Sequence, residues 1–187
     1  MVTLAALWLP IVLSAVACFI AGAILWTVLP HHRSDWSRLP DEDSALDALR
    51  AQGVTPGMYM IPHAATQAAQ QDPAWVENVN KGPTGWVVII DQSHFKSMGP
   101  TLAKNFAYLL LMGVMVAYVG HAALPVGTHY LKVFQVIGTT AIIGHAMGAF
   151  PKAIFWGQSW PVAMKEMFDG VVYGLLTAGV FGWLWPT

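Results

Sequence analysis

Four long apolar segments separated by short connections and one polar stretch limit what this chain can fold into. They cover residues 4–29, 102–123, 129–150 and 160–185. A bilayer core of about 30 Å needs roughly 20 helical residues, because each residue of an α-helix adds about 1.5 Å. Each segment is therefore long enough to cross a membrane. We predict a membrane all-α fold: a four-transmembrane-helix bundle with a small α+β soluble subdomain between helices 1 and 2.

The distribution of charge supports this division. Of the 19 acidic and basic side chains in the chain, 13 lie between Arg33 and Lys96. A nearly uncharged remainder around a charged stretch is typical of lipid-embedded segments that flank a water-solvated one. The predicted organisation is a transmembrane helix in 1–29, a cytoplasmic α+β subdomain in 30–100, and three transmembrane helices in 101–187.

Local patterns predict the elements of the subdomain. Residues 43–50 and the segment from Asp72 are predicted helices, because both open on residues that cap helix N-termini. Residues 58–61 and 86–90 are predicted strands, and the continuous apolar run of the second indicates burial on both of its faces. About 70 residues with two strands cannot bury a large core, so we expect this subdomain to depend on the membrane helices or on a partner.

The orientation follows from the basic residues near the helix ends. Lys132 is the basic residue on the side away from the subdomain. Six lie on the subdomain side: Arg33, Arg38, Lys96, Lys104, Lys152 and Lys165. Because positively charged loops stay in the cytoplasm, this asymmetry places the subdomain in the cytoplasm and both termini in the periplasm.

Small residues recur every four positions in the last two apolar segments. Residues four apart share a helix face, and a row of small side chains lets two backbones approach closely. This pattern predicts helix packing, either inside one chain or between chains. The residues are Gly170, Gly174, Ala178 and Gly182 in the last segment, and Thr140, Gly144 and Gly148 in the segment before it.

Four ionisable residues define a predicted polar membrane cluster at the inner ends of the last two segments: His145, Lys165, Glu166 and Asp169. An unpaired ionisable group at membrane depth costs several kcal/mol, so such groups are candidates for function. One interpretation is a site that moves protons or binds a cation. The other places these groups in the headgroup zone, with Lys165 extended towards water and the acids solvated. The sequence leaves both interpretations open.

Sulfur and imidazole ligands near the soluble stretch raise a copper hypothesis, because both suit copper. The residues are His31, His32, Met58, Met60, His63, His94 and Met98. However, Met58 and Met60 fall on one face of a predicted strand, where a core role is simpler, and the spacing matches no known metal site. We therefore expect no metal and no cofactor.

Catalytic motifs are missing from the sequence. There is no Walker loop, no G-x-S-x-G, no H-E-x-x-H and no paired-cysteine motif, so no catalytic residue is expected and an enzyme is not favoured. The formal net charge of −1 argues against a nucleic-acid partner.

Two stretches carry a resemblance to other proteins. The residues Pro30-His31-His32-Arg33-Ser34-Asp35-Trp36 with Leu39-Pro40-Asp41-Glu42-Asp43, and then Pro56-Gly57-Met58-Tyr59-Met60-Ile61-Pro62, resemble a group of small uncharacterised bacterial inner-membrane proteins. That group has four transmembrane helices and no known activity. The resemblance extends over most of the chain and implies a multi-pass protein of the bacterial cytoplasmic membrane.

These observations favour a non-enzymatic accessory or assembly subunit that acts through helix–helix and subdomain contacts. Its expected partners are the lipid bilayer and either another protein or further copies of the chain. The alternative is a small oligomeric transporter, channel or ion-handling protein that uses the polar cluster. A membrane enzyme with lipid-like substrates is a third possibility.

Overall fold

The chain divides into two units in the structure, a computed structural model that describes residues 2–187. The helical unit contains the residues up to Trp36 together with Gly99–Thr187, and the soluble unit is Ser37–Met98. Both boundaries lie within a few residues of the positions where the charge content of the sequence changes.

Three helices in the described residues are long and apolar enough to cross a membrane: Leu4–Val28, Gly99–Ala123 and Tyr130–Trp156. Only 28–33% of their most apolar windows is buried inside the protein. Most of these apolar side chains therefore face outwards, which lipid accommodates and water does not. The arrangement is compatible with a multi-pass membrane protein.

The last long helix, α8 (Trp160–Trp183), is not among these three. Its 24 residues are enough to span. However, Lys165, Glu166 and Asp169 lie within its first ten positions and lower its mean hydropathy. The predicted count of four spans is therefore not confirmed by length and composition.

The first apolar helix has three parts: the 3-10 turn η1 (Leu4–Leu7), α1 (Trp8–Ala23) and the π-helical turn η2 (Ile24–Val28). Pro10 lies in the first turn of α1, where its missing N–H leaves no helical hydrogen bond unmade. It therefore marks the start of the α-helix. The helix ends before Pro30, because the residue that precedes a proline is disfavoured in the helical region.

The third apolar span contains a break. It consists of α6 (Tyr130–Ala146) and α7 (Ala149–Trp156), which are separated by Met147 and Gly148. The predicted end of this segment at residue 150 is wrong: helical structure continues to Trp156, and Pro151 lies in the first turn of α7, where proline is tolerated. Gly157, with a φ of +71°, ends α7 in the left-handed conformation that favours glycine.

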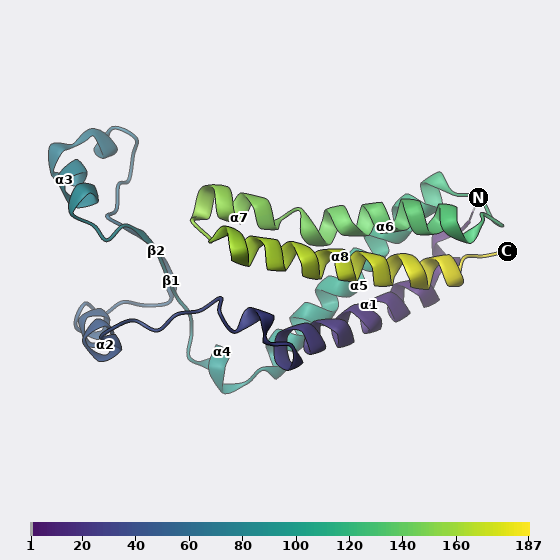
Figure 1. The fold of residues 1–187 in the computed structure, drawn as a ribbon, viewed down its shortest axis with the longest axis horizontal. Helices are drawn as coiled ribbons and strands as arrows, with labels where there is room; N and C mark the ends of the chain where they lie inside the picture. The colour runs from purple at the N-terminus through teal and green to yellow at the C-terminus, as the bar shows by residue number, and fades with distance from the viewer. Residues whose placement is uncertain (1) are drawn as a thin grey trace. The chain divides into compact units, whose positions relative to one another are not determined.

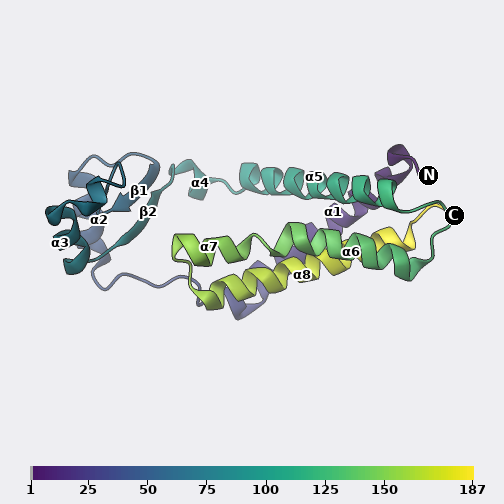
Figure 2. The ribbon, with the colours of Figure 1, turned by 90° about the horizontal axis from the view of Figure 1, so that it is seen from above.

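Helices α1, α5 (Gly99–Ala123), α6 and α8 pack around a common apolar core. Figures 1 and 2 both show α6 and α8 side by side and antiparallel. At one end of this bundle, the Trp185 indole donates to the Pro125 carbonyl at 3.0 Å, and the Gly127 amide donates to the Pro186 carbonyl at 2.9 Å. The residues after α8 are thus tied to the connection between α5 and α6. Buried core residues include Leu7, Ile11, Val116, Val133, Ile137 and Phe181.

The small residues of α8 lie against α6. A Cβ atom added at Gly170 would lie 2.6 Å from the Ala146 Cα, and one added at Gly174 would lie 2.9 Å from the Ile142 amide nitrogen. Both distances are shorter than real contacts of this kind, so no side chain fits between the two backbones at these positions. At Gly182 the close neighbour is a side chain, because a Cβ there would meet the Tyr130 ring of α6 at 2.8 Å.

The predicted stripe on α6 has a different environment. A Cβ added at Gly144 would meet Met112 of α5, and one at Gly148 would meet no atom within 4 Å. The Thr140 hydroxyl donates to the Val136 carbonyl of its own helix at 2.8 Å. The face of α6 that contacts α8 instead contains Gly138, Ile142 and Ala146, which are also four residues apart.

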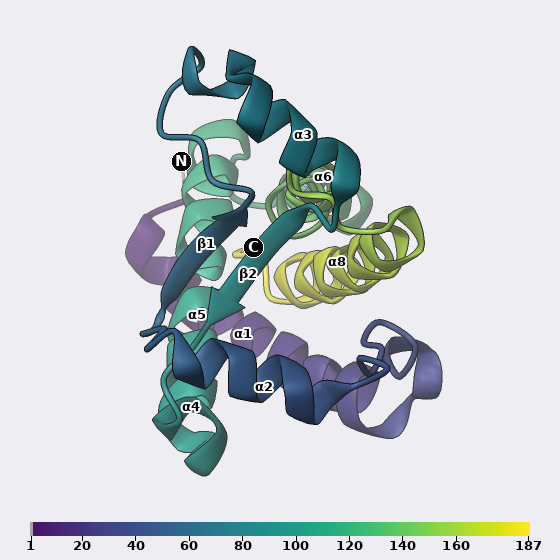
Figure 3. The same ribbon diagram turned by 90° about the vertical axis from the view of Figure 1, so that its left-hand side faces the viewer.

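The soluble unit contains two strands and three short helices. Strands β1 and β2 pair antiparallel, with Gly57 opposite Ile89 and Ile61 opposite Gly85 (Figure 3). Asp41 caps the helix that follows it, and Asp72 caps the next one, with Pro73 in its first turn. The elements are α2 (Glu42–Ala51), β1 (Gly57–Ile61), α3 (Pro73–Lys81), β2 (Gly85–Ile89) and α4 (Ser93–Lys96), with the 3-10 turn η4 at Ala69–Gln71.

No residue between Ser37 and Met98, all of which the structure describes, is buried. The expectation that this part of the chain forms only a small core is confirmed. The expectation that residues 86–90 are buried on both faces is wrong, since Trp86, Val88 and Ile90 are all exposed. A two-stranded sheet with short helices has too few layers to cover both faces of a strand.

Replacing Gly174 with Leu should destabilise the helical unit, because the new side chain has no space between α8 and α6. Overpacking of this kind costs about 1–3 kcal/mol. Gly179 provides a matched control on the same helix, since a Cβ there would meet no atom within 4 Å. Thermal unfolding in mild detergent should show a lower melting temperature for Gly174→Leu than for Gly179→Leu. Equal melting temperatures would contradict the close approach of the two helices.

Candidate functional site

The segment that follows the first helix folds back on itself and brings together His32 and Asp35. Pro30 opens a single 3-10 turn, η3 (Pro30–His32). The Arg33 amide donates to the Pro30 carbonyl at 3.0 Å, and the Asp35 amide donates to the His32 carbonyl at 3.1 Å. These successive turns place the Nδ1 atom of His32 2.6 Å from the Asp35 Oδ2 atom.

Helix α8 supplies the other half of the site. Asp169 accepts a hydrogen bond on each carboxylate oxygen, from His31 Nε2 at 3.1 Å and from His32 Nε2 at 2.8 Å. Lys165, one helical turn earlier, donates to Asp35 Oδ1 at 2.6 Å. We call His31, His32, Asp35, Lys165 and Asp169 the histidine–aspartate cluster. It joins two segments whose paired residues lie 130 to 138 positions apart in the sequence.

The centre of the histidine–aspartate cluster is buried. The side chains of Asp169 and Asp35 are each 4% exposed and that of His32 is 5% exposed. The indole of Trp26 stacks on the His32 ring, with ring centroids 3.8 Å apart and planes 12° apart. Because an ionised carboxylate only accepts hydrogen bonds, both ring nitrogens of His32 donate, and the ring carries a positive charge.

The pKa shifts in the cluster agree with this charge assignment. Burial alone lowers the pKa of His32. The hydrogen bonds to Asp35 and Asp169 and the negative charges of both residues raise that pKa by more than burial lowers it, so the net shift is upwards. Burial alone raises the pKa of Asp35, but its hydrogen bonds to Lys165 and His32 and their positive charges lower it below its usual range. Opposite charges therefore keep both groups ionised.

The predicted polar membrane residues separate into three environments. Lys165 and Asp169 belong to the histidine–aspartate cluster and are linked through Asp35 and His32. Glu166 accepts from Lys152 Nζ at 3.0 Å and from Gln158 Nε2 at 2.6 Å, outside that cluster. The fourth residue, His145, lies between two tyrosine rings.

That fourth residue, His145, has its ring centroid 6.1 Å from the ring of Tyr108 and 5.6 Å from that of Tyr173, both edge-on. Within residues 2–187, no hydrogen bond joins His145 to Glu166 or Asp169. The structure thus brings together two of the four predicted residues and places the other two elsewhere.

Sequence reasoning did not include His31, His32 and Asp35 in this site. The sequence places them in the soluble stretch 30–100, because no periodic pattern links a loop to a distant helix. One indication was available: these residues directly follow the first helix, and Lys165 and Asp169 begin the last one. Both segments were expected on the same side of the membrane.

The same cluster contains a group of possible metal ligands. His31, His32 and Asp169 can each offer one ligand atom, and these three atoms lie within 4.8 Å of one another. No other group of three His, Cys, Asp or Glu residues with this spacing occurs in residues 2–187. Met58 and Met60, which prompted the copper hypothesis, lie on one face of β1.

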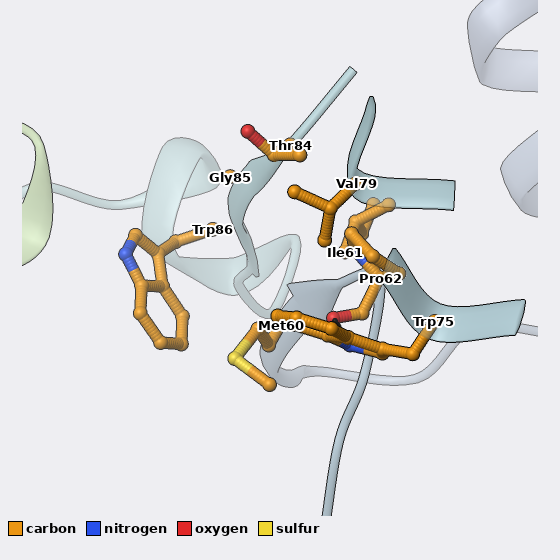
Figure 4. Close-up of a pocket in the computed structure, with 8 residues that line it drawn as sticks. All are labelled: Met60, Ile61, Pro62, Trp75, Val79, Thr84, Gly85 and Trp86. Atoms are coloured by element: carbon orange, nitrogen blue, oxygen red, sulfur yellow. Dashed lines mark hydrogen bonds between the residues drawn. The ribbon is translucent and has the colours of Figure 1, made fainter. Parts of the chain in front are cut away.

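The soluble unit has a separate apolar cleft of about 270 Å³ between the end of the sheet and α3 (Figure 4). Trp75 and Val79 line it from α3, and Met60 and Trp86 line it from the strands. The Trp75 indole donates to the Pro62 carbonyl at 3.2 Å, which fixes one wall. This volume lies at the lower end of the range for small-molecule pockets, about 300–1,000 Å³, and is large enough for one or two apolar side chains.

Comparison with known proteins gave no matching family model, no similar curated protein and no similar solved structure. The function must therefore be argued from the histidine–aspartate cluster, the apolar cleft and the helical unit.

Replacing Asp169 with Ala should destabilise the helical unit strongly, because the buried, charged His32 then loses one of its two carboxylate partners. Breaking a buried ion pair from one side costs about 3–5 kcal/mol. Glu166→Ala, one turn earlier on the same helix, is the control, because its partner Lys152 is exposed and such pairs contribute less than about 1 kcal/mol. Chemical or thermal unfolding in detergent should separate the two variants clearly. Equal losses would show that the Asp169 contacts do not stabilise the bundle.

Proposed function

We propose that this protein is a non-enzymatic accessory or assembly subunit of a membrane. In this proposal, the helical unit is the anchor and the soluble unit binds a protein partner. The observation that carries the proposal is the absence of any buried residue between Ser37 and Met98, a part of the chain that is described throughout. A unit with apolar strands and no buried side chain can bury more apolar surface by binding a partner than a unit with a closed core can.

The sheet of the soluble unit offers a specific surface to that partner. Met58 lies opposite Val88 across the two strands, so their side chains share one face, and they are 65% and 56% exposed. Covering apolar surface is favourable by about 25 cal/mol per Å². An apolar face on two paired strands, next to the apolar cleft, therefore favours a protein partner over a small solute.

The edges of the sheet indicate the form of this partner. In residues 2–187, β1 and β2 pair only with each other, so neither strand has a further strand along its outer edge. An extended segment of another protein can pair with such an edge, with alternate side chains entering an adjacent pocket. We infer that the partner supplies an extended segment with at least one apolar side chain, which occupies the cleft beside Met60.

The membrane placement is part of the same proposal. We infer that α8 is a fourth membrane span, because it packs against α6 from Gly170 to Gly182 and the residues that follow it contact the connection between α5 and α6. The surplus of basic residues near the soluble unit supports a cytoplasmic soluble unit and periplasmic termini. The resemblance in residues 30–62 supports the bacterial inner membrane as the location.

A second candidate function is ion handling, and the histidine–aspartate cluster favours it. Buried ionised groups at the end of a membrane helix are typical of ion and proton sites. A transport path would need several copies of the chain, since large side chains such as Ile137 and Phe181 fill the interior of the bundle. We therefore place this function second.

Site-specific photo-crosslinking in the native membrane tests partner binding. A photoreactive residue at Val88, on the exposed sheet face, should yield a discrete adduct with one other protein. The same residue at Gln67, an exposed position outside the strands, should not. In addition, Val88→Lys should reduce co-purification of the captured protein, because a charge would then face the apolar surface. A crosslinked dimer of the chain would identify a second copy as the partner, and an absence of protein adducts at Val88 would contradict the proposal.

A further inference from the structure

We propose that the histidine–aspartate cluster binds one divalent transition-metal cation, with His31, His32 and Asp169 as its ligands. This inference goes beyond partner binding, which rests on the soluble unit and does not involve these residues. It rests on the chemistry of the three groups, on their spacing and on the contacts that orient them.

The spacing is close to that of a metal site. Imidazole nitrogens and carboxylate oxygens bind zinc at about 2.0–2.2 Å, so ligand atoms around a tetrahedral ion lie roughly 3.4 Å apart. The Asp169 oxygens lie 3.1 Å from His31 Nε2 and 2.8 Å from His32 Nε2, and all three ligand atoms lie within 4.8 Å of one another. The widest of these separations must shrink by at most about 1.4 Å. His31 has room for this shift, because its side chain is 25% exposed and sits on a single 3-10 turn.

The contacts around His32 are those of a metal ligand. Metal-bound histidines usually donate their second ring nitrogen to a carboxylate, which fixes the ring and increases its basicity. The Nδ1 atom of His32 lies 2.6 Å from Asp35, and Lys165 holds the other oxygen of Asp35 at 2.6 Å. Stacking on Trp26 fixes the plane of the ring. The Nε2 atom of His32 is thereby held towards Asp169, where the cation would bind.

The ligand set selects the class of cation. Two imidazoles and one carboxylate suit zinc and its neighbours in the first transition row, whereas magnesium and calcium prefer oxygen ligands throughout. Binding of the cation displaces the proton from His32 Nε2 to solvent, because a protonated nitrogen cannot be a ligand. With both histidines then neutral, Asp35, Asp169 and Lys165 give the site a net charge of −1, which favours a divalent cation. The exposed side of His31 is the route by which the cation and a water ligand would enter.

His31 distinguishes a metal site from a purely structural ion pair that holds η3 against α8, which we call an ion-pair latch. A latch between η3 and α8 depends chiefly on the buried His32–Asp169 and His32–Asp35 pairs, to which the partly exposed His31 adds one more hydrogen bond on Asp169. A cation needs His31 as a third protein ligand. Removing His31 should therefore weaken metal binding sharply, while the His32–Asp169 pair still holds η3 against α8.

The test uses the full chain, purified in detergent with an affinity tag that contains no histidine, stripped with a chelator and then freed of it. Titration with Zn²⁺ against a fluorescent indicator should give one Zn²⁺ per chain. Co²⁺ should produce the visible d–d absorption of a site with four or five ligands. His31→Ala should weaken Zn²⁺ binding at least tenfold, while the metal-free variant still folds and loses less melting temperature than Asp169→Ala does. Asp35→Asn should weaken it about 10–100-fold, because it removes the group that orients His32.

The control is His63→Ala, which removes an exposed histidine of the soluble unit and should leave Zn²⁺ binding unchanged. Asp169→Asn should also lose Zn²⁺ binding. If Asp169→Asn fails to fold, the comparison of His31→Ala with the unaltered chain still tests the proposal. The proposal is overturned if the folded protein shows no saturable Zn²⁺ binding. It is also overturned if His31→Ala binds Zn²⁺ as tightly as the unaltered chain. Either result would leave the histidine–aspartate cluster as an ion-pair latch only.

Discussion

A buried carboxylate on α8 determines how the segment after the first helix must fold. The Asp169 side chain is almost fully enclosed, and an ionised carboxylate in such surroundings costs several kcal/mol unless it is paired. His31 and His32 supply the partners, which requires η3 to lie against α8. Asp35 then balances the charge of His32, and Lys165 pairs with Asp35 and completes its hydrogen bonds. Because its charges are paired in this way, the first part of α8 can enter apolar surroundings.

Close contact between α6 and α8 fixes where that carboxylate points. Gly170 and Gly174 bring the two backbones together, so the rotation of α8 about its axis is set by the face without side chains. Successive helical residues differ by about 100° in direction, so Asp169 points away from that face. The other side of α8 meets α1, where the Cys18 thiol lies 3.5 Å from the Thr177 hydroxyl. The helical unit is thus well determined by packing, whereas the soluble unit, with no buried residue between Ser37 and Met98, has apolar surface left for a partner.

Local features could be predicted from the sequence, and contacts between distant segments could not. Apolar length identified three helices that can span, and Asp72 with Pro73 marked the start of α3, because these effects act within one turn. The four-residue spacing of small residues identified a packing face on α8. The same spacing did not predict that Gly144 faces Met112 of α5, because periodicity identifies a helix face but not the helix that packs against it. His31 and His32 meet Asp169 only after the chain has folded, so the histidine–aspartate cluster had no sequence pattern.

The central claim is that α8 crosses the membrane as a fourth helix and carries paired charges at the end where it enters. Topology reporters fused after Gln67 in the soluble unit and after Thr187 test this most directly. Paired fusions to alkaline phosphatase, active in the periplasm, and to a fluorescent protein, active in the cytoplasm, give complementary readouts at each site. The account predicts a cytoplasmic signal at Gln67 and a periplasmic signal at Thr187. Signals from the same side of the membrane at both positions would contradict it, because α8 would then not cross.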